Sequence, residues 1–324
     1  MPTPAEAAAA ASPTTALIAL DWGSSNLRAR RLGPAGQVLE ERAAALGVLQ
    51  VPPGGFEAAL GQVVGDWLAQ HPNAALLASG MVGSRQGWVE APYLPCPATL
   101  AQAAAALTAV PLQHSAQAGR VLHIVPGLQT EAQGRWDVMR GEETQLWGAG
   151  MPAGGVCVLP GTHSKWVWMG PAGQVQAFQT HMTGELYALL RQHSLLGRLM
   201  AEAPANAPAD DSSAQAAFQA GVQQGLAQGA ALLHLLFSVR TAGLFHQWPA
   251  TALADLLSGL LIGAELQAAL AGQRPTSVTL LGDDALCARY AQALALAGVA
   301  SQAAPAQATT AGQWALAQAA GLAI

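Results

Sequence analysis

A buried strand that ends on polar residues occurs twice in this chain, and that repeat limits the fold more than any other feature. The first copy begins with the apolar run Ala16–Leu20, continues through Asp21 into the turn Gly23–Asn26, and resumes as a strand at Leu27. The second copy is GVCVLPGTHSKWVWMG, with its turn at Gly161. A glycine- and hydroxyl-rich turn between two buried strands can offer successive backbone N–H groups to an anion. The repeat therefore predicts two similar α/β units, each with an anion-binding turn.

The elements that follow each copy occur in a similar order. Alternating segments joined by a turn predict a hairpin after the first copy, and apolar residues at helical spacing predict helices over residues 55–72 and 99–110. After the second copy, long helical stretches are predicted around 213–238 and 250–272, followed by a strand–turn–helix segment over 277–294 and a final helix. This order indicates a duplicated βββαβα unit.

Length and composition set the domain plan. The chain has 324 residues, enough for two domains. Residues 1–15 contain no basic or leucine-rich signal region, so we interpret them as a disordered tail. We expect an N-terminal domain over 16–148 and a C-terminal domain over 149–324, with the last helix free to pack back on the first domain.

Charge and cysteine content exclude several functions. The apolar windows are broken before they reach the ~20 residues that a membrane-spanning helix needs. A net charge of −5 argues against nucleic-acid binding. The three cysteines, Cys96, Cys157 and Cys287, are far apart and form no CxxC, which indicates neither a disulfide framework nor a zinc site. We therefore expect a cytoplasmic protein that needs neither nucleic acid nor membrane, and a homodimer is one of the assemblies allowed.

Both turns have the composition of a phosphate-binding loop. Glycine allows close approach, hydroxyl groups donate, and Lys165 adds a positive charge. We expect ATP phosphates to be bound by Gly23, Ser24, Ser25, Asn26, Gly161, Thr162, His163, Ser164 and Lys165. Asp21, at the strand end, could hold Mg²⁺, which prefers oxygen ligands. The alternative is that Asp21, Ser24 and Ser25 only cap a tight turn.

Further acidic residues occupy two helix starts. Glu142 and Glu143, in RGEETQ, could supply the carboxylate that accepts a hydroxyl proton in phosphoryl transfer, or they could only favour the helix dipole. Gly282 and Asp283 lie between a strand and a helix. They could admit adenosine to the helix N-terminus, and Asp283 could equally be its N-cap.

The loop that contains GSRQGWVEAPY carries an arginine beside aromatic residues. Arginine can bind a carboxylate with two parallel hydrogen bonds, so Arg85 suits a sugar-acid ligand. The plain alternative is a solvated loop in which one tryptophan is packed.

Five segments in register resemble a known family: DWGSSNLRA, GMVGSRQGWVEAPY, VMRGEETQLWG, LPGTHSKWV and THMTGELYALLRQHSLLG. Together they are similar to the 2-dehydro-3-deoxygalactonokinases, which belong to the actin-like sugar kinases. The resemblance implies ribonuclease-H-like domains with mixed sheets flanked by helices on either side of a cleft. It also implies phosphorylation of 2-dehydro-3-deoxygalactonate at its 6-hydroxyl by ATP with Mg²⁺. The implied substrate-binding residues are Arg28, Ser84, Arg85, Gln86, Trp88 and Tyr93.

The resemblance also bears on the acidic residues. Relatives place a carboxylate just before the second phosphate strand, often with Thr, Ala or Asn two residues later, and Glu142 has this spacing through Thr144. Glu143 is the alternative base. Many sugar kinases carry Asp at this position, and several also carry an Asp in the second phosphate turn, where this chain has Pro-Gly-Thr-His. Asp21 is therefore the principal carboxylate expected to bind the metal ion.

Other functions of the same fold compete with the kinase. Another sugar-acid kinase is one alternative. A phosphohydrolase similar to exopolyphosphatases also carries adjacent glutamates, but a polyphosphate channel should be basic and this chain is acidic. A sugar-sensing regulator would need a DNA-binding head, and the segment before Ala16 is too short for one.

Overall fold

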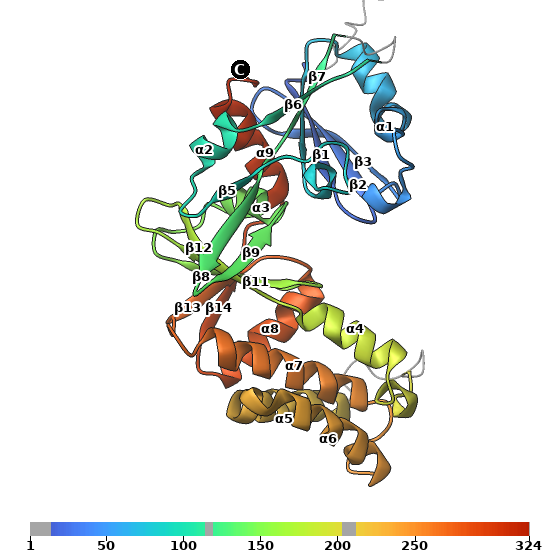
Figure 1. Cartoon of the computed structure of the whole chain (residues 1–324), viewed down its shortest axis with the longest axis vertical. Helices are drawn as coiled ribbons and strands as arrows, with labels where there is room; N and C mark the ends of the chain where they lie inside the picture. Colours follow the sequence, from blue (N-terminus) through green and yellow to red (C-terminus); the bar gives the residue numbers. More distant parts are fainter. Residues whose placement is uncertain (1–13, 114–118, 203–211, 324) are drawn as a thin grey trace, which may run out of the picture. The chain divides into compact units, whose positions relative to one another are not determined.

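The computed structural model describes residues 14–113, 119–202 and 212–323. This part of the chain forms two compact units (Figure 1). Unit 1 comprises Met1–Gln129, Val138–Gly150 and Gln307–Ile324, and unit 2 comprises Thr130–Asp137 and Met151–Ala306. The tail expected at residues 1–15 lies, as far as residue 13, outside the described residues.

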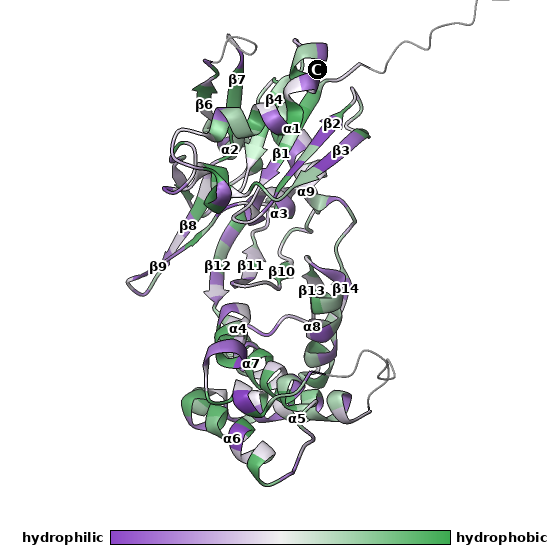
Figure 2. Ribbon diagram, turned by 90° about the vertical axis from the view of Figure 1, so that its right-hand side faces the viewer, coloured by the Kyte–Doolittle hydropathy of each residue, from purple (hydrophilic) through white to green (hydrophobic). Residues whose placement is uncertain are grey.

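Unit 1 is built on a mixed sheet with the strand order β3-β2-β1-β4-β7-β6. β1 pairs antiparallel with β2 and parallel with β4, and β4 pairs parallel with β7. The strands are β1 (Leu17–Trp22), β2 (Leu27–Leu32), β3 (Val38–Ala44), β4 (Ala75–Ser79), β6 (Thr108–Pro111) and β7 (Val121–Ile124). β3 is an edge strand with purple, hydrophilic stretches in Figure 2. Its charged side chains pair with those of β2 and protect the edge, for example Glu41 with Arg30.

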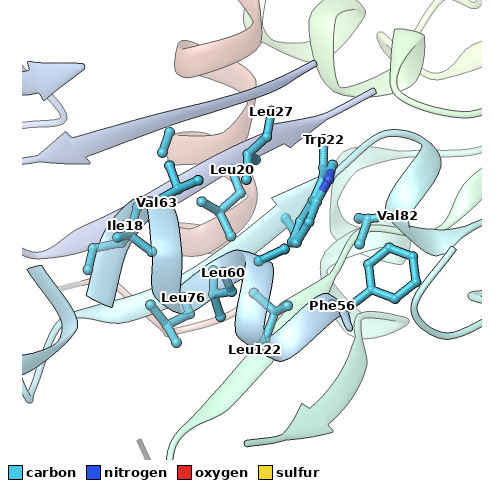
Figure 3. Close-up of a cluster of buried hydrophobic side chains, with 14 of the residues drawn as sticks. Ile18, Leu20, Trp22, Leu27, Phe56, Leu60, Val63, Leu76, Val82 and Leu122 are labelled. Atoms are coloured by element: carbon cyan, nitrogen blue, oxygen red, sulfur yellow. The ribbon is translucent and has the colours of Figure 1, made fainter. Parts of the chain in front are cut away.

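β1 is apolar along most of its length because both of its faces are covered. Ile18, Leu20 and Trp22 point into a core with α1 (Phe56–Gln70), part of which is drawn in Figure 3. Leu17 and Ala19 point into a second core with residues of α2 and α9. These helices are α2 (Leu100–Ala105) and α9 (Ala308–Ala319), and α9 lies beside α3 (Glu142–Gly148) in Figure 1.

A second, smaller sheet consists of β5 (Tyr93–Pro95), β8 (Gly127–Ala132) and β9 (Arg135–Met139). The tip of its β8–β9 hairpin belongs to unit 2, because the carboxylate of Asp137 accepts hydrogen bonds from the N–H and hydroxyl of Thr180, each at 2.6 Å. Apart from this hairpin tip and the last helix, the division between the two units falls between Gly150 and Met151.

Unit 2 repeats the central strand order of unit 1. Its sheet runs β12-β11-β10-β13-β14, with β10 antiparallel to β11 and parallel to β13. The strands are β10 (Val156–Leu159), β11 (Ser164–Met169), β12 (Val175–His181), β13 (Ser277–Leu280) and β14 (Ala300–Ala303). Two units with this shared order confirm the predicted duplicated α/β fold.

Helices of unit 2 pack on this sheet and on one another. They are α4 (Thr183–His193), α5 (Ser212–Gln228), α6 (Leu232–Leu244), α7 (Leu253–Ala269) and α8 (Asp284–Leu296). α5 and α7 approach so closely that a Cβ on Gly259 would lie 2.1 Å from the carbonyl oxygen of Phe218. Short 3₁₀ turns complete the chain: η1 (Val48–Gln50), η2 (Met81–Gly83), η3 (Gly197–Leu199) and η4 (Gly229–Ala231).

Two predicted helices were wrong in extent. The Ala-rich stretch 99–110 is a helix only in α2, and its last residues lie in β6, where they pair with β7. The stretch 213–238 is divided by η4 into α5 and α6. Within the described ranges, none of the helices is both long enough and apolar enough to cross a lipid bilayer.

Candidate active site

The carboxyl ends of β1 and β4 bring the acidic residues of unit 1 to one edge of the sheet. Asp21 pairs in register with Ser79, the last residue of β4. The next residue, Gly80, has φ +94°, and a Cβ there would lie 2.9 Å from the carbonyl oxygen of Trp22. Gly141, with φ +106°, passes so close to Gly80 that an added Cβ would lie 3.2 Å from the Gly80 Cα. Only residues that tolerate positive φ allow this approach, which places the start of α3 against the end of β4.

Asp21 is half-buried at the end of β1, opposite Arg28 on β2. Burial raises the pKa of its carboxyl, and the charge of Arg28, whose Nη1 lies 3.8 Å from Oδ2, opposes that rise. In the part of the chain that the structure describes, no cluster of three His, Cys, Asp or Glu could hold a metal by itself. Mg²⁺ commonly uses one or two carboxylates plus phosphate oxygens and water. A single half-buried carboxylate therefore fits a Mg²⁺ that arrives with a nucleotide.

The first turn is held by the segment that begins at Gly47. The carbonyl oxygens of Gly23, Ser24 and Ser25 accept hydrogen bonds from the N–H groups of Val48, Leu49 and Gly47, at 2.9, 3.1 and 3.1 Å. In a trans peptide the N–H of the next residue points opposite to the carbonyl. The N–H groups of Ser24, Ser25 and Asn26 consequently point away from that segment. This orientation suits an anion better than a turn that merely closes on itself.

The adjacent glutamates at the start of α3 have different surroundings. Glu142 is half-buried, and its Oε2 accepts a hydrogen bond from the Arg140 N–H at 3.0 Å. Glu143 is 0% exposed, and its oxygens accept from the Gly141 N–H at 2.7 Å and the Thr144 hydroxyl at 3.1 Å. Burial, with the charge of Glu142 as the next cause, raises the pKa of Glu143 to about 7. Of the two carboxyl groups, that of Glu142 is accessible to solvent and that of Glu143 is not.

The predicted sugar-acid loop leaves the end of β4 through η2. Ser84 is buried, and its hydroxyl has no hydrogen-bond partner among the described residues. Arg85 and Gln86 are exposed, and the side chain of Arg85, at 86% exposure, lies 3.4 Å from Glu90. The loop therefore presents the guanidinium of Arg85 at the surface, paired with Glu90, rather than enclosed in a pocket.

Aromatic residues anchor the middle and the end of this loop. Trp88 stacks on Phe56, with ring centroids 6.0 Å apart, and meets the edge of Trp22. This matches the alternative of one packed tryptophan. The ring of Tyr93 lies under the guanidinium of Arg140, with 4.3 Å between Cζ and the ring centroid.

The second turn is fixed by the first turn of α4. The Thr162 carbonyl accepts a hydrogen bond from the Glu185 N–H at 2.9 Å, so the His163 N–H points away from α4. His163 Nε2 and Glu185 Oε2 are 2.5 Å apart. The buried Lys165 donates to the His163 carbonyl at 3.3 Å. Backbone donors, exposed Thr162 and the cation of Lys165 are thus gathered at one turn.

A pocket of about 200 Å³ opens beside the second turn, within unit 2. It lies between α4, α7 and α8, and its lining is largely apolar or aromatic. The residues that line it are Gly161, Thr183, Gly184, Tyr187, Ser258, Leu261, Ile262, Leu286, Arg289 and Tyr290. Asp283 is the N-cap of α8, since its carboxylate accepts from the Leu286 N–H at 3.0 Å. Gly282, with φ +155°, lies against the carbonyl of Pro160. The residues that follow β10 and β13 are therefore neighbours.

Sequence reasoning missed several side chains at these sites. Arg140 is buried, donates to the Ala91 carbonyl at 2.7 Å and connects the loop to α3. Gln313 of α9 is buried behind Asp21 and donates to the Leu20 carbonyl and the Ser79 hydroxyl at 2.8 and 2.9 Å. Glu265 is the one carboxylate in the buried, apolar part of α7; the other carboxylate of this helix, Asp255, lies in its first turn. One signal was present in the sequence: an isolated polar residue in an otherwise apolar segment.

Comparisons with known proteins agree on one family. The family model described as 2-keto-3-deoxy-galactonokinase matches residues 21–316. The 2-dehydro-3-deoxygalactonokinase of Escherichia coli K-12 is 38% identical over 289 residues, which cover 88% of this chain and 91% of that protein. A Rhizobium meliloti protein with the same enzyme name, DgoK1, is 39% identical and covers 87% of this chain and 89% of its own.

Solved structures agree in fold. A crystal structure of a candidate 2-dehydro-3-deoxygalactonokinase from Sinorhizobium meliloti has a TM-score of 0.82 at 37% identity, over 94% of this chain and 98% of that one. A ligand-bound xylulose kinase from Lactobacillus acidophilus, at 10% identity and a TM-score of 0.50 over 94% and 89% of the two chains, shows the same fold alone. The chain therefore belongs to the 2-keto-3-deoxy-galactonokinase family and has the actin-like fold of sugar kinases.

Proposed function

We propose that this protein transfers the γ-phosphoryl group of ATP to the 6-hydroxyl of 2-dehydro-3-deoxygalactonate. The observation that carries the proposal is the family match over residues 21–316, because it encloses both turns, the glutamate pair and the loop after β4. The structure supports it independently through the half-buried carboxylates at the end of β1 and at the start of α3. Kinase catalysis depends mostly on positioning and electrostatics, which such rigid strand ends can provide.

Proton transfer is assigned to Glu142. Its carboxylate accepts the proton of the attacking 6-hydroxyl as the new O–P bond forms, and the ADP oxygen takes the electrons of the bond that breaks. The backbone N–H of Arg140 orients this carboxylate by donating to its Oε2. Glu143 acts through the backbone, because its oxygens hold the Gly141 N–H and the Thr144 hydroxyl at the helix start.

Phosphate binding is assigned to both turns. The N–H groups of Ser24, Ser25 and Asn26 would donate to the phosphates from the first turn. The N–H groups of residues 161–163, the Thr162 hydroxyl and Lys165 would donate from the second turn. Asp21 would hold Mg²⁺, which neutralises charge on the transferring phosphates. Arg28, 3.8 Å from Asp21, would limit the negative charge at this edge before the nucleotide arrives.

Nucleoside binding is assigned to the pocket beside the second turn. Its volume of about 200 Å³ and its apolar walls suit a purine ring, and Gly161 belongs to both the pocket and the turn. Gly282 and Asp283 shape its border by starting α8, which contributes Leu286, Arg289 and Tyr290.

Acceptor binding is assigned to the loop after β4. Ser84, Arg85 and Gln86 supply its polar groups, while Trp88 and Tyr93 fix its middle and its end. Arg85 would pair with the acceptor carboxylate in place of Glu90. The enzyme would act in the cytoplasm, where ATP is present, on a small-molecule acceptor. We also propose that the protein forms a homodimer, which a sedimentation experiment would test.

A panel of acceptors tests this function. ADP release should be measured with ATP and Mg²⁺ in the presence of 2-dehydro-3-deoxygalactonate, its gluconate epimer, neutral sugars and no acceptor. We expect turnover with the 2-keto-3-deoxy acids and little turnover with neutral sugars. Equal nucleotide hydrolysis with and without an acceptor would instead identify a phosphohydrolase of the same fold.

A further inference from the structure

Glu265 is a buried carboxylate in an otherwise apolar part of α7, with 4% of the residue exposed. Its Oε1 accepts hydrogen bonds from the Ser164 hydroxyl and the Trp166 indole N–H, each at 2.8 Å. Its Oε2 accepts from the Tyr290 hydroxyl at 2.7 Å and from the Thr183 hydroxyl. These four donors match the acceptor capacity of an ionised carboxylate.

The four donors come from three other elements, two of which, β11 and α4, are distant in sequence from α7. Ser164 and Trp166 belong to β11, Thr183 is the first residue of α4, and Tyr290 belongs to α8. A buried charge is costly unless it is fully hydrogen-bonded, and an apolar residue would pack in this interior at lower cost. The carboxylate therefore fixes a geometry that packing alone would leave loose.

Three of the four donors to Glu265 belong to the proposed nucleotide site of unit 2. Ser164 closes the second turn, while Thr183 and Tyr290 line the pocket beside it. The start of α4 also contacts the turn directly, since a Cβ on Gly184 would lie 2.3 Å from the carbonyl oxygen of Gly161. Glu265 itself does not line the pocket, so it reaches a nucleotide only through the groups it holds.

We propose that Glu265 is a positioning residue that locks the second turn, the start of α4 and Tyr290 into the arrangement that binds the nucleotide. This inference rests on the proposed function insofar as the pocket and turn bind ATP. It assigns Glu265 no contact with the acceptor. Loss of its charge should therefore affect nucleotide binding and leave acceptor binding unchanged.

The test compares Glu265→Gln with the wild type. Glutamine has nearly the same shape, but it offers one acceptor oxygen and directs an NH₂ group at donors. We expect binding of a non-hydrolysable ATP analogue with Mg²⁺, measured by calorimetry, to weaken at least tenfold. The KM for ATP should rise in parallel, and the KM for the keto acid should stay within twofold. A folded Glu265→Gln protein with analogue affinity within twofold of wild type would overturn the inference.

Matched variants separate positioning from general destabilisation. Glu57→Gln makes the same change at a buried carboxylate of α1, which accepts from the Gln113 N–H, and should leave analogue affinity unchanged. If Glu265→Gln does not fold, Trp166→Phe decides the matter, because it removes one donor to Glu265 from a side chain that does not line the pocket. The analogue should bind Trp166→Phe at least fivefold more weakly, whereas Trp168→Phe, the same change on the same strand, should bind normally. Equal affinity of these two variants would contradict the inference.

The calorimetric readout needs no acceptor. A wild-type protein that binds the analogue but does not phosphorylate the keto acid would refute the proposed acceptor and still allow Glu265 to be judged. A wild-type protein without analogue binding would refute both.

Discussion

The Arg140 N–H lies 3.0 Å from Oε2 of Glu142, and the guanidinium of the same residue donates to the Ala91 carbonyl at 2.7 Å. One residue thus touches both the proposed base and the loop proposed to bind the acceptor. The neighbouring Glu143 is enclosed completely. This difference in surroundings assigns different roles to two identical side chains.

Glu142→Gln should lower kcat by roughly 10²–10⁴ with little change in the KM for ATP, the usual share of general-base catalysis. The matched variant Glu143→Gln should retain more activity, since Glu143 does not reach the surface. Steady-state kinetics on both variants provides the check. A crippled Glu143→Gln beside an active Glu142→Gln would show that the base was assigned to the wrong residue.

Glu143 should make stability depend on pH. Its pKa is about 7 in the fold against an ordinary 4.5, so folding favours the protonated form. Stability from this group is fully present below pH 4.5 and is lost as pH rises through 7, by about 3 kcal/mol at ~1.4 kcal/mol per pKa unit.

Urea unfolding at several values between pH 4.5 and 8 measures this dependence as the difference between the wild type and Glu143→Gln. The wild type should lose stability relative to the variant across this range. A constant difference would show that Glu143 keeps an ordinary pKa.

Asp21→Asn should preserve the fold, because the side chain lies at a strand end and keeps its volume. It should remove most of kcat by weakening the placement of Mg²⁺ with ATP, and the residual activity should respond to higher Mg²⁺. Activity assays over a magnesium series test this. Near wild-type turnover at saturating Mg²⁺ would reduce Asp21 to a turn cap.

Arg85→Ala should raise the KM for the keto acid tenfold to a hundredfold, because charge-assisted hydrogen bonds contribute about 1.5–3 kcal/mol. Arg85→Lys should restore only part of this, since an ammonium group lacks the planar fork. Glu90→Gln is the control, because it removes the present ion-pair partner of Arg85 and should not weaken acceptor binding. Calorimetry with both ligands decides, and weakened ATP binding alone would place Arg85 on the nucleotide side.

The contact between α5 and α7 should tolerate no added methyl group. Gly259→Ala would place a Cβ 2.1 Å from the Phe218 carbonyl oxygen, so we expect a loss of about 1–3 kcal/mol or more. Gly65→Ala, in the middle of α1 with open space around it, should instead stabilise by about 0.5–1 kcal/mol. Thermal unfolding of both variants measures the contrast, and similar melting temperatures would contradict the close helix contact.

The sequence predicted those features that depend on residues close together in the chain. The strands at Asp21 and Gly161 were predictable because an apolar run ends abruptly on turn residues in both places. The end of α2 was not, because Ala and Leu suit a helix until pairing with β7 draws Thr108–Pro111 into a strand. Glu265 stands out in the sequence as a polar residue in an apolar segment, but its hydrogen-bond donors were not predictable, since they lie as many as 101 positions away. Glu142 and Glu143 also differ in their exposure to solvent, and no local sequence pattern predicts that difference.

The reaction itself is the most direct test of the central claim. Purified protein with ATP, Mg²⁺ and 2-dehydro-3-deoxygalactonate should yield ADP and a phosphorylated acid in equal amounts, and ³¹P–¹H coupling in the product should place the phosphate on carbon 6. Release of free phosphate without a phosphorylated acid, or phosphorylation at another hydroxyl, would contradict the account.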